Sequence, residues 1–216
     1  MEVLKMDTMK EKVSYCIGLE TVKNLMRQFS DIESQCLLDG INDALGGKNQ
    51  KLAQDEVNAI MQALRQQVEH QQKEFITKLS EHNRKEGEEF LAKNKQEDGI
   101  KTLSSGLQYK VLQQGNGEKP TPVDMVTVHY RGRFIDGRIF DSSYERGKPH
   151  VFPVNRVIPG WSEALQLMRV GDKWNIFVPH YLAYGEAGFG NEIAPCTTLI
   201  FEMELLGIND EVSLKA

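Results

Sequence analysis

The sequence predicts an α+β protein in which a helical N-terminal half precedes an antiparallel sheet wrapped around one short helix. Three observations predict this. Apolar residues recur at helical spacing through the first 97 residues, and from residue 107 they alternate with polar residues, as in half-buried strands. Within the second half, residues 151–168 begin as an apolar strand, turn at Pro159-Gly160 and continue as a short helix. We therefore expect a helical domain at 1–97 and a second domain at 98–216.

Composition restricts the classes of partner. The net charge of −5 argues against nucleic acid, because phosphate binding needs a basic surface. No apolar run is long enough to cross a membrane, so no membrane contact is expected. The three cysteines are an odd number without a C-x-x-C pair, which favours a reducing compartment. The expected location is the cytoplasm, with the periplasm as the alternative if a signal peptide has been removed.

The first two helices carry more apolar surface than they can bury against each other. Residues 10–29 form the first, and Ser30-Asp31-Ile32-Glu33 has the spacing of a capping box that begins the second. Gly46-Gly47 ends it. The excess predicts a homodimer through residues 10–45. Packing of the same surface against the C-terminal domain is the alternative.

Residues 52–97 are expected to form one long helix that acts as an arm. The segment has no proline, and only Gly87 interrupts its strong helix formers. Its apolar stripe is thin and its other positions are polar, which is typical of a spacer. A continuous coiled coil is the competing interpretation.

The pattern of apolar and turn-forming residues in the second half predicts a series of strands joined by turns. Asp136-Gly137 between two apolar pairs is a hairpin signal. A long glycine-containing loop, 180–197, is expected to be functional. The remaining expectations are a linker at 102–106, strands at 107–111, 125–134, 174–178 and 198–206, and a frayed tail at 209–216.

The usual catalytic templates are absent from the sequence. The five histidines have no metal-ligand spacing with the cysteines, and there is no G-x-S-x-G motif or P-loop. No metal and no cofactor is therefore expected. The remaining candidates for a functional site are aromatic residues close in sequence to an acidic residue, Asp141, and an arginine, Arg146. Trp161 opens the short helix and could form the floor of a pocket, or could simply be a core residue.

Five blocks of this half resemble the FKBP-type peptidyl-prolyl isomerases. They are residues 128–132, 136–143, 157–161, 181–185 and 198–206, and their order and spacing match over roughly 105–207. Residues 14–19 resemble the dimerising helical domain of the bacterial Mip-like members. The resemblance implies a twisted antiparallel sheet around a short helix, with an apolar pocket for a prolyl ring between them.

The resemblance also implies roles for residues of the pocket. Tyr184 and the backbone amide of Ile158 would hold substrate carbonyls, and Arg146 would pair near Asp141. Two positions depart from the family pattern, because His150 stands where many members have Phe and Ala194 where a second proline is common. The catalytic set would be Tyr130, Phe140, Asp141, Tyr184 and Phe201. The substrate-binding set would be Phe152, Val157, Ile158, Trp161, Ile193 and Arg146.

The implied activity is peptidyl-prolyl cis-trans isomerisation, combined with dimer-dependent binding of client proteins. Rotation about an Xaa-Pro bond is opposed by amide resonance, and a dry aromatic pocket disfavours the dipolar planar amide relative to the twisted one. Expected partners are proline-containing unfolded or nascent proteins, with the macrolides rapamycin and tacrolimus as inhibitors. The alternatives are a non-catalytic holdase that uses the same pocket and a structural coiled-coil adaptor.

Overall fold

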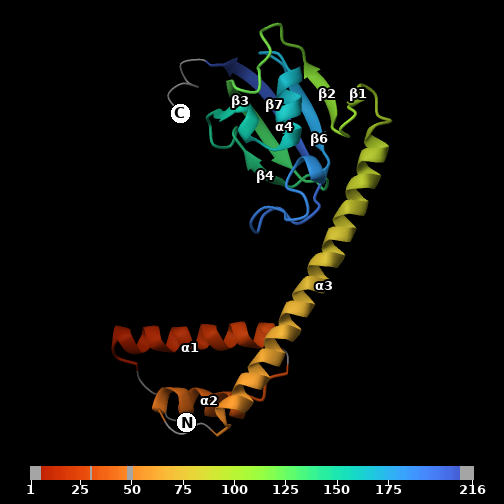
Figure 1. Ribbon diagram of the computed structural model, residues 1–216. Helices are drawn as coiled ribbons and strands as arrows, with labels where there is room; N and C mark the ends of the chain where they lie inside the picture. Colours follow the sequence, from red (N-terminus) through yellow and green to blue (C-terminus); the bar gives the residue numbers. More distant parts are fainter. Residues whose placement is uncertain (1–5, 30, 48–50, 210–216) are drawn as a thin grey trace. The chain divides into compact units, whose positions relative to one another are not determined.

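The computed structural model describes residues 6–29, 31–47 and 51–209 and has the predicted α+β fold (Figure 1). Its helices are α1 (Met9–Gln28), α2 (Ser34–Gly46), α3 (Gln54–Asn94) and α4 (Pro159–Leu167), with 3-10 turns η1 (Val154–Arg156) and η2 (His180–Leu182). Its strands are β1 (Ile100–Thr102), β2 (Gln108–Gln113), β3 (Met125–Arg133), β4 (Ile139–Ser142), β5 (His150–Pro153), β6 (Lys173–Val178) and β7 (Leu199–Ile208).

The strands form one antiparallel sheet in the order β1-β2-β6-β7-β3-β4, and β5 pairs with β3 beside β4. β3 and β7 are the long central strands, and Tyr130 of β3 lies opposite Met203 of β7. The hairpin expected at Asp136-Gly137 is present, because Gly137 has a φ of +88° and Arg133 pairs with Ile139 across it. Figure 1 shows α4 lying across this sheet.

The core lies between the sheet and α4. Trp161, Ala164, Leu165 and Met168 are all buried, so the helical spacing seen in the sequence corresponds to the buried side of α4. Gly160 allows this close packing, since an added Cβ would lie 2.6 Å from the side chain of Val178 on β6. The short helix is thereby fixed with its N-terminal end against the sheet.

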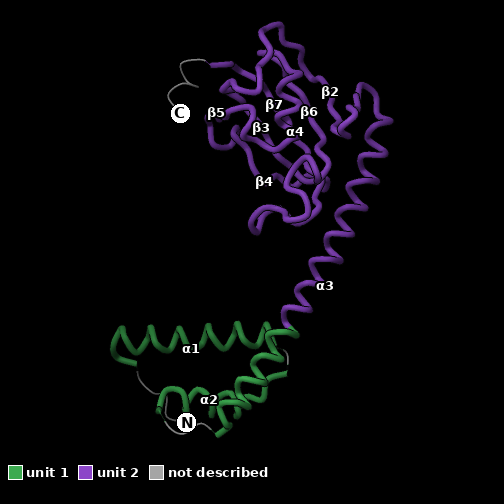
Figure 2. Tube along the Cα trace, viewed as in Figure 1, with its two compact units in different colours: residues 1–67 green, residues 68–216 purple. Residues whose placement is uncertain are grey.

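Contacts divide the chain into two compact units, 1–67 and 68–216, with the division inside α3 (Figure 2). The C-terminal half of α3 belongs to the second unit because it packs on the sheet. Phe90 of α3 lies against Phe177 of β6, and the Gln108 side chain donates to the Leu91 carbonyl at 2.9 Å. The unit boundary therefore lies earlier in the chain than the domain boundary expected at 97/98, which stays a prediction.

In the first unit, α1 and α2 have no buried side chain. The capping box is at Thr8 and Glu11 of α1, where Glu11 N–H donates to Thr8 Oγ1 and Thr8 N–H donates to Glu11 Oε2. The capping box expected at Ser30–Glu33 is wrong as the start of the second helix. That helix begins at Ser34 after Glu33, which makes no side-chain cap, and Ser30 lies outside the described residues. Gly47 ends α2 in the left-handed conformation, as predicted.

Three further expectations need correction. Part of the expected linker is strand β1, which pairs with β2. The long loop contains η2 and a bridge between Phe189 and Ile193. The tail is anchored at its first residue, because the Asn209 side chain accepts from Met125 N–H and donates to Asp124; residues 210–216 lie outside the described part. Within the described residues, no helix is both long and apolar enough to span a bilayer.

Candidate active site

A cavity of about 510 Å³ opens between the sheet and the N-terminal end of α4. Side chains of β3, β4, β5, η1, β7 and the loop after η2 contribute to it, together with those of α4 and the residues before it. Its lining residues are Tyr130, Phe140, Asp141, His150, Phe152, Arg156, Val157, Ile158, Trp161, Tyr184 and Phe201.

Trp161 is the aromatic centre of this cavity. Its ring makes edge-to-face contacts with Tyr130 at 4.9 Å, Phe201 at 5.2 Å and Phe152 at 5.6 Å between ring centroids. Phe140 meets Phe201 in the same way at 5.7 Å. Such geometry is favoured by the ring quadrupoles, so contacts between the rings help to hold the walls in place. Trp161 is at once a buried core residue and part of the cavity lining.

Gly132 of β3 makes room for two of these rings. A Cβ at this position would lie 2.6 Å from Phe140 and 3.0 Å from Phe201. A larger residue would push both rings into the cavity, which explains in physical terms why the residue two positions after Tyr130 is glycine.

A polar cluster of Tyr130, Asp141 and Arg146 borders the aromatic walls. The Tyr130 hydroxyl donates to Asp141 Oδ2 at 2.5 Å, and Arg146 donates to Asp141 Oδ1 and, at 2.8 Å, to the Tyr130 oxygen. The Arg146 guanidinium also lies over the Tyr130 ring, 5.5 Å from its centroid. The three side chains therefore fix one another at the edge of the cavity.

The cluster sets the protonation states of its members. Burial acts to raise the pKa of Asp141, but hydrogen bonds from Tyr130 and Arg146 outweigh it and hold that pKa below its ordinary value. Burial, helped by the hydrogen bond to Asp141, raises the pKa of Tyr130 to about 12. At neutral pH the cluster thus presents a carboxylate, a protonated phenol and a guanidinium.

The expected site residues do not all lie in the cavity wall. Nine of the eleven line it, and Arg146 touches it only through Asp141 and Tyr130. Ile193 is absent from the lining, because its side chain is buried in the core and its backbone pairs with Phe189. Arg156 of η1 lines the cavity and was missed, since no motif in the sequence distinguishes it from other surface arginines.

Tyr184 reaches the cavity from the loop that follows η2. Burial raises the pKa of its phenol, so the hydroxyl remains a hydrogen-bond donor at neutral pH. His150 lies at the cavity beside Phe152, with ring centroids 4.4 Å apart. Within the described residues, no three His, Cys, Asp or Glu side chains are grouped as metal ligands. The chemistry available is burial of an apolar ring beside hydrogen-bonding groups at the edge.

Comparisons with known proteins agree with this geometry. A family model described as FKBP-type peptidyl-prolyl cis-trans isomerase matches residues 116–206, and a model of the domain amino-terminal to this isomerase matches 10–111. The chain is 41% identical over 203 residues to the FKBP-type 22 kDa peptidyl-prolyl cis-trans isomerase of Escherichia coli, covering 94% of this chain and 97% of the relative. It is 40% identical over 207 residues to the outer membrane protein MIP of Legionella longbeachae, covering 96% and 89%.

Solved structures give the same result. The crystal structure of FkpA from Escherichia coli matches with a TM-score of 0.74 and 34% identity, covering 94% of this chain and 98% of that one. A peptidyl-prolyl cis-trans isomerase from Pseudomonas syringae matches with a TM-score of 0.57 and 40% identity, covering 61% and 96%. The chain therefore belongs to the FKBP-type peptidyl-prolyl cis-trans isomerases and is an enzyme of that class.

Proposed function

We propose that the aromatic cavity is where this isomerase binds the prolyl ring and lowers the barrier to rotation. The observation that carries this is the set of perpendicular rings around Trp161. The planar amide is the more dipolar state and loses more hydration on entering such a cavity than the twisted state does. Catalysis then consists of positioning and desolvation, without proton transfer.

The residue roles that we propose are those that the family resemblance implies, and the positions of the side chains are compatible with them. Phe140, Phe201, Trp161, Phe152 and Val157 would enclose the ring. Tyr184 and the Ile158 amide would bind substrate carbonyls. Tyr130 and Arg146 would hold the Asp141 carboxylate toward the twisting carbonyl, where its charge tunes the local field.

Loss of one wall tests this proposal. Phe201→Ala or Phe140→Ala should slow isomerisation of a short Xaa-Pro peptide by one to a few powers of ten, because each 1.36 kcal/mol is a factor of ten. Phe75→Ala is a matched control, since this side chain is 68% exposed on α3, away from the cavity. Wild-type rates in both cavity variants would reject the site. The alternative, a holdase whose pocket binds without catalysing, would be favoured instead if the wild-type protein bound the peptide without accelerating its isomerisation.

We also propose a homodimer through residues 10–45. Its support is the apolar surface of α1 and α2, where Ile17 is 62%, Leu38 51% and Leu45 83% exposed. A monomer rarely leaves such a surface uncovered. Leu38→Glu should halve the mass measured by light scattering, whereas Val123→Glu, also at an exposed apolar residue, should not. Deletion of residues 1–48 distinguishes the coiled-coil adaptor, in which mass depends on 52–97.

Dimerisation would give the enzyme its action on client proteins. Two weak sites on one unfolded chain gain through effective concentration. Leu38→Glu should therefore keep the wild-type rate on a short peptide while refolding a large proline-limited protein poorly. Equal refolding by the variant and the wild type would remove the chaperone role of the dimer.

We also propose that macrolides inhibit this enzyme by binding in the prolyl cavity. Rapamycin and tacrolimus would occupy the prolyl cavity, and His150→Phe should strengthen their inhibition if the histidine weakens packing at the edge.

The cytoplasmic expectation finds no support among the relatives, one of which is named an outer membrane protein. We therefore favour the periplasmic alternative, which fractionation of cells expressing the native gene would test.

A further inference from the structure

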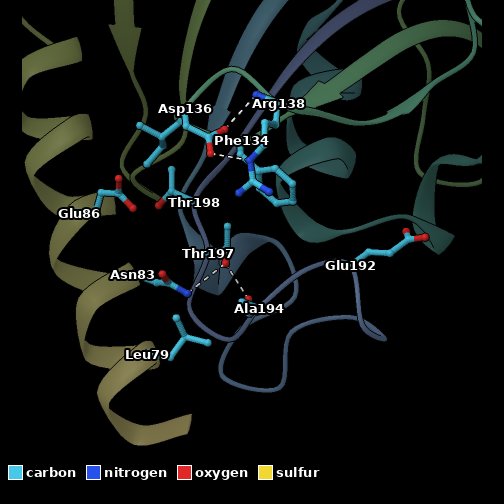
Figure 3. A pocket seen from close by; sticks show the side chains of 11 residues that line it. Leu79, Asn83, Glu86, Phe134, Asp136, Arg138, Glu192, Ala194, Thr197 and Thr198 are labelled. Atoms are coloured by element: carbon cyan, nitrogen blue, oxygen red, sulfur yellow. Dashed lines mark hydrogen bonds and ion pairs between the residues drawn. The ribbon is translucent and has the colours of Figure 1, made fainter. Parts of the chain in front are cut away.

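The loop that carries Tyr184 is tied to α3 by polar contacts. The Asn83 amide donates to the Pro195 carbonyl at 2.8 Å and lies 3.4 Å from Thr197 Oγ1. Figure 3 shows Asn83 reaching from the helix to Thr197, whose hydroxyl donates in turn to the Ala194 carbonyl at 2.7 Å. All three contacts fall on the last turn of the loop before β7.

Arg84, the next residue of α3, contacts both ends of the same loop. Its Nη2 lies 3.1 Å from Glu186 Oε1, just after Tyr184, and 3.6 Å from the sulfur of the buried Cys196. Cys196 N–H donates to the Gly185 carbonyl at 2.8 Å, so these two residues close the base of the loop. A side chain that reaches Glu186 and Cys196 therefore fixes the point from which Tyr184 projects.

The base of the loop has a conformation that external contacts must maintain. Cys196 has a φ of +57°, in the left-handed region that a residue with a side chain seldom adopts. Gly188 also has positive φ, and a Cβ there would lie 2.2 Å from the Ile193 carbonyl oxygen. Such a backbone persists only where its surroundings hold it.

On the α3 side, an opening lies between the helix and the loop. A cavity of about 220 Å³ separates the helix from the loop and the β3–β4 hairpin, and Figure 3 shows Leu79, Asn83 and Glu86 facing Phe134, Asp136 and Thr197 around it. Across this opening, Asn83 and Arg84 make polar contacts with the loop. They are therefore groups that can restrain the position of the loop from the helix.

We propose that Asn83 and Arg84 are positioning residues of the isomerase, which hold the 183–197 loop so that Tyr184 lines the prolyl cavity. The inference rests on the proposed role of Tyr184 in substrate binding. Both residues lie outside the isomerase family match at 116–206. The enzyme thus uses the end of its helical arm as part of the framework of its active site.

Substitution of Asn83 and substitution of Arg84 should disturb the loop to different extents. The Asn83 bond to Pro195 is partly buried, whereas the Arg84–Glu186 pair is exposed, with Glu186 at 80%. Exposed ion pairs contribute little and are screened by salt. We therefore expect a larger effect from Asn83, and one that does not change with ionic strength.

The test is steady-state kinetics of full-length variants on a short Xaa-Pro peptide, with kcat and KM measured separately. Asn83→Ala and Asn83→Asp both remove the amide donor, and the second keeps its shape. Because the role proposed for Tyr184 is to hold a substrate carbonyl, we expect KM to rise about five-fold, with kcat within two-fold of wild type. Arg84→Ala should raise KM about two-fold. Gln72→Ala and Lys85→Ala, exposed polar positions of α3 with no contact to the loop, are the controls and should change neither.

Hydrogen exchange provides a readout that is independent of activity. Amides of the loop, including Cys196 N–H, should exchange faster in Asn83→Ala, while those of β3 and β7 stay protected. The proposal is overturned if KM and loop exchange both match wild type. It is also overturned if kcat falls with the melting temperature at constant KM, since that is loss of folded protein. Phe201→Ala measured in parallel separates the two proposals: normal activity there would reject the site, while loop exchange would still decide the role of Asn83.

Discussion

Replacement of Gly87 by alanine tests how closely α3 approaches the sheet. Gly87 is the buried residue of α3 in the described structure, and it lies against Thr198 at the start of β7. An added Cβ would lie 2.3 Å from Thr198 Oγ1 and 3.1 Å from Thr198 Cβ. Rotation of the threonine side chain would relieve the first contact but not the second.

Two opposing terms set the magnitude. Alanine in place of glycine stabilises a helix interior by about 1 kcal/mol. Overpacking at a buried site costs about 1–3 kcal/mol, and Thr198, only 2% exposed, has little room to move. We therefore expect Gly87→Ala to lower the free energy of unfolding by about 1 kcal/mol.

Urea unfolding of the single and double variants measures this balance. In a Thr198→Ala background the contact with the hydroxyl is gone and only the 3.1 Å contact with Cβ remains, so Gly87→Ala should destabilise less than in the wild type, with a coupling energy of about 0.5–1 kcal/mol. If Gly87→Ala stabilises the otherwise wild-type protein by its full helix propensity, the close approach of helix and strand is refuted.

Two further predictions concern ionisable groups. Tyr130→Phe removes a donor to Asp141 and should cost about 1 kcal/mol at pH 7. Because the folded pKa of Asp141 is lowered, that stability exists above about pH 4 and is lost as pH falls, so urea midpoints of variant and wild type should converge near pH 2; a constant difference would contradict this. Burial and nearby Arg84 lower the pKa of His180, so wild-type stability should fall as pH drops below about 6.5. His180→Asn should flatten that decline in thermal unfolding, and an unchanged slope would show that His180 does not cause it.

Much of the fold could be predicted because it depends on neighbours in the sequence. The change of apolar period marked where helices give way to strands, Asp136-Gly137 specified a hairpin, and Pro159 with Trp161 specified α4. Element ends were less certain. Thr8 caps α1. The similar spacing at Ser30–Glu33 does not mark the start of α2, which begins at Ser34 after Glu33.

The residues of the candidate site also fall into those that the sequence could predict and those that it could not. Tyr130, Phe140 and Phe201 could be named because they sit within short recognisable blocks, and the cavity brings them together. Arg156 could not be, since its approach to the cavity depends on how η1 turns after β5. Ile193 was expected in the wall and instead packs in the core, because the loop folds back at Phe189.

By itself the sequence determined the fold class, the family resemblance and the aromatic residues of the pocket. Only the tertiary structure decided that Asn83 meets Pro195, 112 positions further on, and that Gly87 must be small to face Thr198. The physical reason is the separation in sequence between the residues that interact. Helix periodicity, turns and caps are set by residues within a few positions, whereas these contacts exist only after the sheet has placed its last strand beside the helix.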